Sequence, residues 1–283
     1  MKKDCFDANT GPKALTDCIK SLNRVLIAHS GGVDSTLLVN IAKSALPEGT
    51  FALSIKSPLI HDFEIEAAIR EAERIGVPHY VIDFNPFEMD HIRKNLTDRC
   101  YHCKREIFRI ILGAARELGI EHVLDGTNAD DTDDYRPGMR ALSELKIESP
   151  FLELGIGKEM IREMSRSLNI PGTERPPMAC LATRFPYNDE ITLEKIDGVK
   201  KAELVLMSHG FKTVRVRHLG GPPKTAKIEV GESEIERLLS PDLRDRIYSE
   251  IRRLGFSSVT VDLGGYRSGR MNEGLEGPDS DKP

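Results

Sequence analysis

The residues with the clearest chemical potential form a short loop of small and polar side chains. The loop lies between the apolar run 24–28 and the amphipathic run 37–42, an order that predicts a buried strand, a turn and a helix start. Backbone N–H groups at a helix start favour an anion such as phosphate, although an ordinary strand-to-helix turn is the alternative. The carboxylate of Asp34 is unexpected in a site for anions alone, and it predicts a Mg²⁺ ion held between this carboxylate and the bound phosphates. The members of this predicted nucleotide site are Ser30, Gly31, Gly32, Val33, Asp34, Ser35 and Thr36.

This S-G-G-x-D-S pattern differs from a Walker A loop, which has the form G-x-x-x-x-G-K-[ST]. It resembles the PP-loop of the N-type ATP pyrophosphatases. The resemblance implies that ATP is cleaved between its α and β phosphates and that a carboxylate or carbonyl oxygen is adenylated. A nucleophile then displaces AMP, and the motif does not specify which nucleophile.

A second polar segment follows the apolar run 122–125 and continues to residue 138. It carries more acidic residues than a turn needs, and acids beside a nucleotide site favour Mg²⁺ ligation, here by Asp130 and Asp131. An exposed acidic loop is the alternative. Gly126 and Asn128 of the same segment are predicted to contact the nucleotide.

Three of the five cysteines have sequence contexts that fit metal binding, redox chemistry or nucleophilic attack. Cys100 and Cys103 form a C-x-x-C pair, which fits a redox dithiol, half of a metal site or two incidental thiols. Cys180 precedes Arg184 by four residues, and a nearby cation favours a nucleophilic thiolate. A buried apolar thiol is the alternative for Cys180. Three thiolates together could hold a 4Fe–4S cluster in which one iron lacks a cysteine ligand.

Two arginines in a strand-like run form a further candidate site. Arg215 and Arg217 are two residues apart, so both are expected on one face of a strand. Paired guanidiniums suit a phosphate or carboxylates, and a solvated strand face is the alternative.

The elements around these residues predict an α/β fold for the first part of the chain. Alternation of strands and helices is typical of a parallel sheet with helices on both faces, which binds ligands beyond the carboxyl ends of its strands. The expected strands are 24–28, 50–56, 79–84 and 122–125, and the expected helices are 61–75, 101–118 and 158–168.

A Pro- and Gly-containing segment at 171–177 marks a change in pattern. Beyond it, a small α+β domain is predicted. Its expected elements are a helix at 192–207, paired strands at 213–219 and 225–230, a helix at 233–253 and a strand at 257–263. The predicted organisation is a domain at 1–187, a domain for substrate binding or oligomerisation at 188–272 and a disordered tail at 273–283.

Composition narrows the class of protein. The 283 residues are 39% hydrophobic and 30% charged, which is typical of a soluble globular chain. No apolar run reaches the ~20 residues of a membrane span, and the first residues lead into no apolar signal core. We therefore expect a cytoplasmic protein without membrane association. The net charge of −5 argues against extensive nucleic-acid binding.

Taken together, the motifs closely resemble one family within the PP-loop superfamily, LarE, the ATP-dependent sulfur transferases of nickel-pincer nucleotide synthesis. The resemblance spans roughly residues 15 to 272, and its most discriminating part is the C-L-A-[ST]-R segment that begins at Cys180. The matching segments are 30–36, 99–104, 125–131 with 134–138, 178–184, 214–217 and 262–269.

The resemblance implies that Mg·ATP adenylates a carboxylate of pyridinium-3,5-biscarboxylic acid mononucleotide. Sulfur then replaces an oxygen and gives a thiocarboxylate and AMP. In one branch of the family the sulfur comes from a cysteine at the position of Cys180, which becomes dehydroalanine. In another branch three cysteines hold a 4Fe–4S cluster, and Cys100 and Cys103 match that branch. A homo-oligomer is also implied, and so is a substrate site formed by Arg184, Arg215, Arg217 and Asp262.

Three other functions fit parts of the pattern. A PP-loop tRNA thiolase would need a basic RNA-binding surface, which the net charge disfavours. An amidotransferase-type ligase would use ammonia and need no cysteine trio. A non-catalytic nucleotide-binding or iron–sulfur scaffold would not need the intact PP-loop with Asp130 and Asp131.

Overall fold

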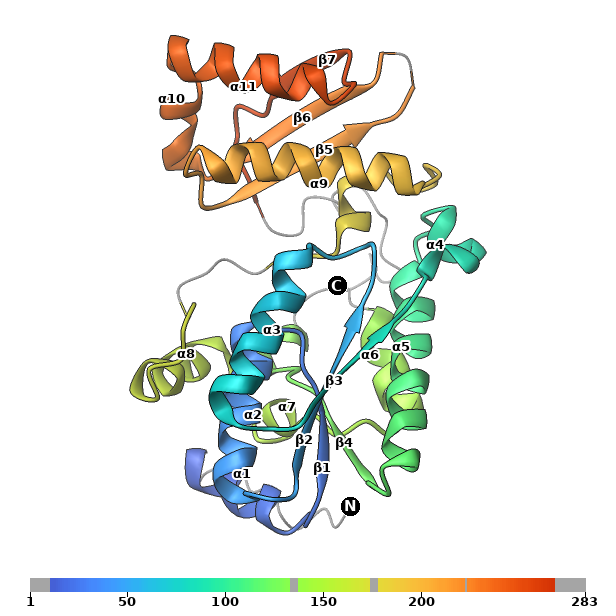
Figure 1. Cartoon of the computed structure of the whole chain (residues 1–283), viewed down its shortest axis with the longest axis vertical. Coiled ribbons are helices and arrows are strands. Elements are labelled where there is room, and N and C mark those ends of the chain that lie inside the picture. Colours follow the sequence, from blue (N-terminus) through green and yellow to red (C-terminus); the bar gives the residue numbers. More distant parts are fainter. Residues whose placement is uncertain (1–10, 133–136, 174–177, 222, 268–283) are drawn as a thin grey trace, which may run out of the picture. The chain divides into compact units, whose positions relative to one another are not determined.

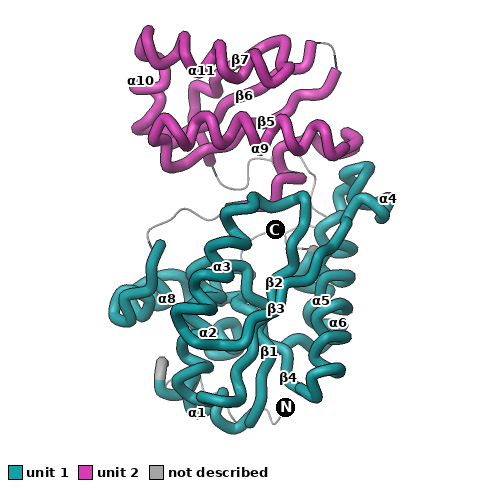
Figure 2. Tube along the Cα trace, in the orientation of Figure 1, with its two compact units in different colours: residues 1–178 teal, residues 179–283 magenta. Residues whose placement is uncertain are grey.

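The computed structural model describes residues 11–132, 137–173, 178–221 and 223–267, so the predicted tail at 273–283 lies outside the described residues. The chain divides into two compact units, residues 1–178 and 179–283 (Figure 2). The segment 179–187, expected in the first domain, groups with the second unit, and Arg184 of this segment is ion-paired to Glu203 of that unit. Within the described ranges, no helix combines the length and apolar character that a membrane span requires.

Four parallel strands form the sheet of the first unit, in the order β3-β2-β1-β4 (Figure 1). The predicted α/β fold with a parallel sheet is thereby confirmed. The chain places β2 and β3 on one side of β1 and β4 on the other, so the strand order reverses at β1, where open sheets bind ligands. The strands are β1 (Val25–Ala28), β2 (Thr50–Lys56), β3 (His79–Asp83) and β4 (His122–Leu124).

Helices cover both faces of this sheet, as the alternation of its side chains requires. In β1, Val25 and Ile27 join the core that contains α1, α2 and α8, whereas Leu26 joins the core that contains α5 and α6. The helices and short 3₁₀ turns of the unit are α1 (Gly11–Lys20), α2 (Val33–Ala45), α3 (Asp62–Ile75), η2 (Pro86–Glu88), α4 (Asp90–Arg93), α5 (Arg99–Glu117), η3 (Ala129–Thr132), α6 (Pro137–Glu144), α7 (Pro150–Glu153) and α8 (Lys158–Ser167).

The second unit is a three-stranded sheet with helices packed on it (Figure 1). The strand order is β5-β6-β7, with β5 and β6 antiparallel and β6 and β7 parallel. Side chains of α9 and α11 share one apolar core with the strands. The elements are η4 (Leu181–Arg184), α9 (Leu193–Ser208), β5 (Val214–Leu219), β6 (Thr225–Val230), η5 (Glu232–Glu234), α10 (Ile235–Leu238), α11 (Pro241–Arg253) and β7 (Ser258–Val261).

One predicted helix of this unit is interrupted. The pattern at 233–253 predicts a continuous helix, but the structure has η5, α10 and α11 there. Pro241 occupies the first turn of α11, with Ser240 as its N-cap. A proline has no N–H for a helical bond and disfavours helical backbone in the preceding residue, so the chain ends one helix and starts another.

Candidate functional site

The PP-loop connects β1 to α2 and is shaped by its first glycine. Gly31 has a φ of +75°, a conformation that glycine adopts without strain. A Cβ atom at this position would lie 2.8 Å from the backbone oxygen of Glu64 in α3. Gly32 is the extended N-cap of α2 and has no side chain to cover the first N–H groups of the helix. The backbone of the loop is thus shaped as a helix N-terminus open to an anion.

Hydroxyl groups of the loop hold its shape. Ser35 Oγ accepts a hydrogen bond from the backbone N–H of Ser30 at 3.2 Å and lies 3.1 Å from Ser30 Oγ. Thr36 is buried, and its Oγ1 lies 3.2 Å from Nε2 of His29. The loop is therefore preorganised by its own side chains.

The two predicted nucleotide segments meet at the point where the strand order reverses. Asn128, which follows β4, donates from Nδ2 to Oδ2 of Asp34 at 2.8 Å. A Cβ atom at Gly126 would lie 3.0 Å from the backbone nitrogen of Ser35, which is tighter than an ordinary contact, so glycine favours this close approach of the two loops. Asp34, Gly126 and Asn128 are thus neighbours in space although the chain separates them widely.

The electrostatics around Asp34 favour a bound cation. Burial raises the pKa of Asp34 above its usual range, and the charge of Asp131 adds to this effect. The hydrogen bond from Asn128 and the charges of Lys158 and Arg162 act in the opposite direction. Two carboxylates close enough to interact form a donor set suited to Mg²⁺.

Asp130 and Asp131 both contact the start of α8. Asp130 is exposed and accepts a hydrogen bond from the backbone N–H of Lys158 at 2.6 Å. Asp131 is buried, accepts from the N–H of Asn128 at 3.2 Å and lies 3.5 Å from Nζ of Lys158. Asp131 is therefore the member of the pair whose charge acts on Asp34, whereas Asp130 fixes α8. The residues 133–136 that continue this acidic stretch lie outside the described residues.

The sequence analysis did not single out Lys158 and Arg162. Their charges act on Asp34 because α8 begins beside the PP-loop, and positive charge there would balance the phosphates of ATP. The signal in the sequence is a glycine, Gly157, directly before a helix whose first residue is basic.

The C-x-x-C pair lies at the start of α5, with Cys100 in its first turn and Cys103 in its second. Cys100 is exposed and Cys103 is partly exposed, and residues three apart on a helix lie on the same face. Among the described cysteines, which also include Cys18 and Cys180, none forms a disulfide. Cys5 lies outside the described residues. Two neighbouring thiols at a helix start fit paired metal ligands as well as a dithiol.

Cys180 belongs to the second unit and is exposed. Arg184 is fully buried and forms a two-pronged ion pair with Glu203 of α9, at 2.7 and 3.2 Å. Its Nη1 atom donates to the backbone oxygen of Ala179 and to Oγ1 of Thr183, which itself donates to the backbone oxygen of Cys180. Arg184 therefore fixes the backbone on both sides of the cysteine.

The predicted substrate residues are all engaged within the second unit. Arg217 forms a two-pronged ion pair with Glu229, with both bonds at 2.8 Å, and donates to the backbone oxygen of Thr183. Asp262 accepts from Nζ of Lys227 at 3.0 Å. This network connects β5 and β6 to the Cys180 segment.

Arg215 is more buried than a residue on a solvated strand face would be. Its side chain is buried and stacks over the ring of Tyr266, with 4.8 Å to the ring centroid. Burial lowers the pKa of Arg215, and the charge of Arg184 contributes to the shift. The carboxylate of Glu203 and the ring of Tyr266 act in the opposite direction on the pKa of Arg215.

Glu203 and Glu229, which pair with these arginines, were missed by the sequence analysis. Both are fully buried. The signal was an acidic residue at a core position, within the apolar face of α9 for Glu203 and in the largely buried half of β6 for Glu229. A buried carboxylate requires a charged partner, so such positions predict an arginine or lysine nearby.

The parallel sheet, the PP-loop and the adjoining acidic segment define an ATP-using enzyme of the PP-loop class. The asparagine synthase family profile matches residues 13–132, which contain this site. The chain is 35% identical to the pyridinium-3,5-bisthiocarboxylic acid mononucleotide synthase of Lactiplantibacillus plantarum, over 94% of this chain and 95% of that protein. The chain thus belongs to the LarE family and is a sulfurtransferase.

Two further relatives, one more similar and one less similar to this chain, are consistent with the family assignment. An uncharacterised protein of Synechocystis sp. is 38% identical over 90% of this chain and 94% of its own length. A tRNA-specific 2-thiouridylase of Methylobacterium nodulans is 27% identical over 79% of this chain and 73% of its own length. The tRNA thiolases are therefore the more distant relatives.

Proposed function

We propose that the protein uses ATP to activate a carboxylate of pyridinium-3,5-biscarboxylic acid mononucleotide and replaces one of its oxygens with sulfur, a step in nickel-pincer nucleotide synthesis. The observation that carries the ATP step is the bond between Asp34 and Asn128, which brings the PP-loop and the acidic segment together. The full-length similarity to the Lactiplantibacillus plantarum synthase supports the choice of substrate.

In this proposal the PP-loop binds the phosphates of ATP. Backbone N–H groups at the start of α2 would contact the phosphate oxygens. Asp34 and Asp131, with Asp130 beside them, would hold Mg²⁺, which neutralises phosphate charge when bound. A substrate carboxylate oxygen attacks the α-phosphorus and forms an acyl adenylate, and pyrophosphate leaves. Lys158 and Arg162 would stabilise the charge of the departing pyrophosphate.

The acyl adenylate then takes sulfur. In the sacrificial form, the Cys180 thiolate attacks the acyl carbon, AMP leaves and a thioester forms. A base removes the Cα proton of Cys180, the Cβ–S bond breaks and the electron pair goes to sulfur. The products are a thiocarboxylate and a dehydroalanine at position 180, so the protein loses the elements of H₂S. Arg184 acts in this step as a positioning residue for the Cys180 backbone.

The second form of the proposal uses a 4Fe–4S cluster held by Cys100, Cys103 and Cys180. The exposure of Cys100 and Cys180 and the partial exposure of Cys103 suit thiolate ligands that receive a cluster from outside. When bound, the cluster would supply the sulfide, so that Cys180 stays intact. Because the chain has all three cysteines, we favour this form.

The LarE resemblance also leads us to propose a homo-oligomer and a substrate site near Arg215, Arg217 and Asp262.

The test starts with anaerobic purification and analysis of iron and acid-labile sulfide. The protein is then incubated with ATP, Mg²⁺ and the dicarboxylate mononucleotide, and the product and the intact protein are analysed by mass spectrometry. We expect a thiocarboxylate product, bound iron and an unchanged Cys180. Loss of the elements of H₂S from Cys180 in iron-free protein would overturn the cluster form. Thiolated tRNA without any thiocarboxylate would favour a tRNA thiolase instead.

A matched pair of variants separates a role in sulfur transfer from a role in packing. Cys100→Ala should remove iron binding and multiple turnover. Cys18→Ala, which changes a buried cysteine in α1, should keep both. Full multiple turnover by Cys100→Ala would contradict cluster ligation.

A further inference from the structure

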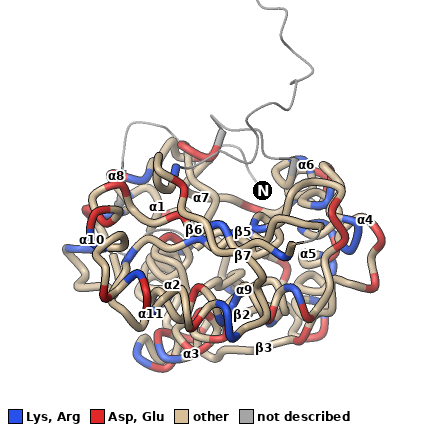
Figure 3. The backbone as a smooth tube through the Cα atoms, turned by 90° about the horizontal axis from the view of Figure 1, so that it is seen from above, with Lys and Arg blue, Asp and Glu red and all other residues tan. Residues whose placement is uncertain are grey.

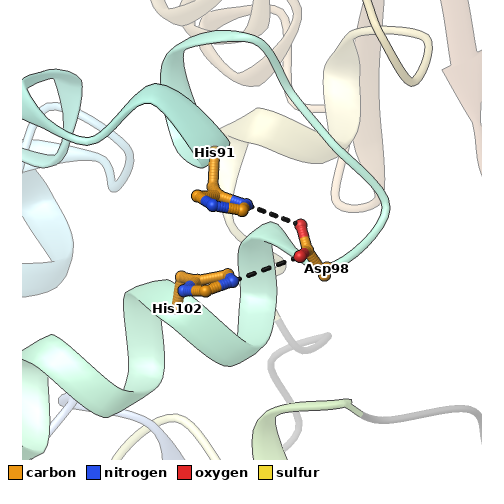
Figure 4. Close-up of side chains that lie close together, drawn as sticks. All are labelled: His91, Asp98 and His102. Carbon is orange, nitrogen blue, oxygen red and sulfur yellow. Dashed lines mark hydrogen bonds and ion pairs between the residues drawn. The ribbon is translucent and has the colours of Figure 1, made fainter.

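Two histidines and an aspartate converge beside the C-x-x-C pair (Figure 4). His91 comes from α4, Asp98 is the N-cap of α5 and His102 lies in the first turn of α5. Nδ1 of His91 donates to Oδ1 of Asp98 at 3.0 Å, and Nε2 of His102 donates to Oδ2 at 3.1 Å. The two imidazole rings are stacked, with their centroids 3.7 Å apart.

The spacing of these atoms matches the coordination shell of a small cation. One candidate donor atom from each of the three residues lies within 4.8 Å of the other two. Metal–ligand bonds of about 2.0–2.2 Å place adjacent donors roughly 3 Å apart. Each histidine nitrogen lies at this distance from one oxygen of Asp98, that of His91 from Oδ1 and that of His102 from Oδ2. The two nitrogens favour a transition metal, since Mg²⁺ and Ca²⁺ prefer oxygen ligands.

Backbone hydrogen bonds hold these three residues in place before any ion binds. The N–H of Leu96 donates to the oxygen of His91 at 3.0 Å, and the N–H of Tyr101 donates to the oxygen of Asp98 at 3.0 Å. Between them, Asn95 is fully buried with a φ of +53°. The turn from α4 to α5 is therefore tightly specified, and a specified turn lowers the entropy cost of binding an ion.

The donor set also suits a cation. Asp98 offers carboxylate oxygens, and His91 and His102 each offer a ring nitrogen. A metal ion would replace the two protons that the histidine nitrogens now donate.

We propose that His91, Asp98 and His102 form a binding site for one divalent transition-metal ion of the Zn²⁺ or Co²⁺ type. The three residues leave coordination positions for water, because all three side chains are partly exposed. The ion would join α4 to the start of α5 and so fix the end of the helix that carries Cys100 and Cys103. This site is independent of the proposed substrate and of the ATP site.

The test is a titration of the full chain, purified without metal or cluster, with Co²⁺, followed by visible absorption and equilibrium dialysis. We expect one equivalent of Co²⁺ with ligand-field bands of nitrogen and oxygen ligands and no thiolate charge-transfer band. Zn²⁺ should displace it, and the first equivalent should be unchanged in Cys100→Ser/Cys103→Ser protein. His91→Ala and Asp98→Asn should each weaken binding by at least about tenfold, since each removes a ligand.

His209→Ala is the matched control, because His209 also contacts a carboxylate, that of Glu250, but has no second histidine in that pair. It should leave Co²⁺ affinity unchanged. Circular dichroism establishes that each variant is folded, and Asp98→Asn, which keeps side-chain size, serves if His91→Ala does not fold. Binding that is equal in wild type, His91→Ala and Asp98→Asn would overturn the proposal. A thiolate charge-transfer band at the first equivalent, lost in the double cysteine variant, would also overturn it.

Discussion

At the scale of single residues, Asp34 is the most informative position of the ATP site. Its carboxylate is partly buried near the charge of Asp131, and both factors raise its pKa. A bound Mg²⁺ would reverse this effect by favouring the ionised form. The same residue should therefore oppose folding slightly in the protein without ligands and promote catalysis in the complex with ATP.

Replacement of Asp34 by asparagine tests this account. Asp34→Asn keeps the size of the side chain and can still accept the bond from Asn128, so the free energy of unfolding should be equal or higher. The rate of pyrophosphate release should fall by about 100-fold, a typical loss for one electrostatic contact in an active site. Asp197→Asn, which alters an exposed ion pair with Lys201, should change neither quantity. Full activity in Asp34→Asn would refute a role in cation binding.

His29 makes the stability of the first unit depend on pH. Burial lowers its pKa from 6.5 to about 4, with a further contribution from His79. The unfolded chain takes up a proton below pH 6.5 while the folded chain does not, so stability should fall by about 3 kcal/mol between pH 6.5 and 4 because of this group. Urea unfolding at a series of pH values measures the effect.

The variant His29→Gln should lose most of this slope, whereas His209→Gln, near the surface of the second unit, should keep it. Equal pH dependence in wild type and His29→Gln would show that other groups cause the acid destabilisation.

The sequence was sufficient to identify residues that belong to distinctive local patterns. It was not sufficient for residues whose contact partners come from other elements of the fold. The PP-loop and the acidic segment stand out because their spacing is local. Glu203 and His91 could not be assigned partners, because Arg184 and Asp98 approach them only when separate elements pack together. Arg215 was expected on an exposed or ligand-binding face, but it is buried and stacks over Tyr266, which lies far from it in the sequence.

At the scale of elements, the strands were predictable and the helix ends less so. The expected strands at 50–56 and 225–230 coincide with β2 and β6, because apolar runs bounded by turns mark them clearly. Pro241 is the sequence signal for the interruption before α11. The prediction of one long helix followed the helical periodicity on both sides of this proline.

Two glycines in different settings test how the PP-loop is built. Gly31→Ala forces a left-handed alanine against the backbone of Glu64 and should destabilise the protein by at least about 1–3 kcal/mol. Gly113→Ala lies within α5 with no atom near its added methyl group and should stabilise the protein by about 0.5–1 kcal/mol. Chemical denaturation measures both. Similar effects of the two substitutions would contradict the close approach of the loop to α3.

Two ion pairs of α9 differ in burial and should differ in energy. Glu203→Gln leaves the guanidinium of Arg184 buried without its charge partner and should cost about 3–5 kcal/mol in the free energy of unfolding. Glu194→Gln removes an exposed pair with Lys224 and should cost about 1 kcal/mol or less. Glu203→Gln should also slow sulfur transfer, because the Cys180 segment is fixed through Arg184. Equal stability of the two variants would contradict this view of the network.

At the scale of the whole molecule, two compact units carry different parts of the proposed reaction. The first unit holds the PP-loop and the C-x-x-C pair, and the second holds Cys180 with its arginine network. The sequence analysis placed a domain boundary after residue 187, and the two compact units divide after residue 178. Basic and acidic positions are interspersed along helices such as α3 and α11 (Figure 3).

The central claim is that ATP is cleaved between its α and β phosphates to adenylate a substrate carboxylate. The most direct measurement uses the dicarboxylate mononucleotide labelled with ¹⁸O in its carboxylates, followed by mass spectrometry of the released nucleotide. Because the carboxylate oxygen that attacks phosphorus stays on the phosphate, the account predicts AMP that carries one ¹⁸O atom, together with unlabelled pyrophosphate and a thiocarboxylate. Release of ADP, or of AMP without ¹⁸O during thiocarboxylate formation, would contradict it.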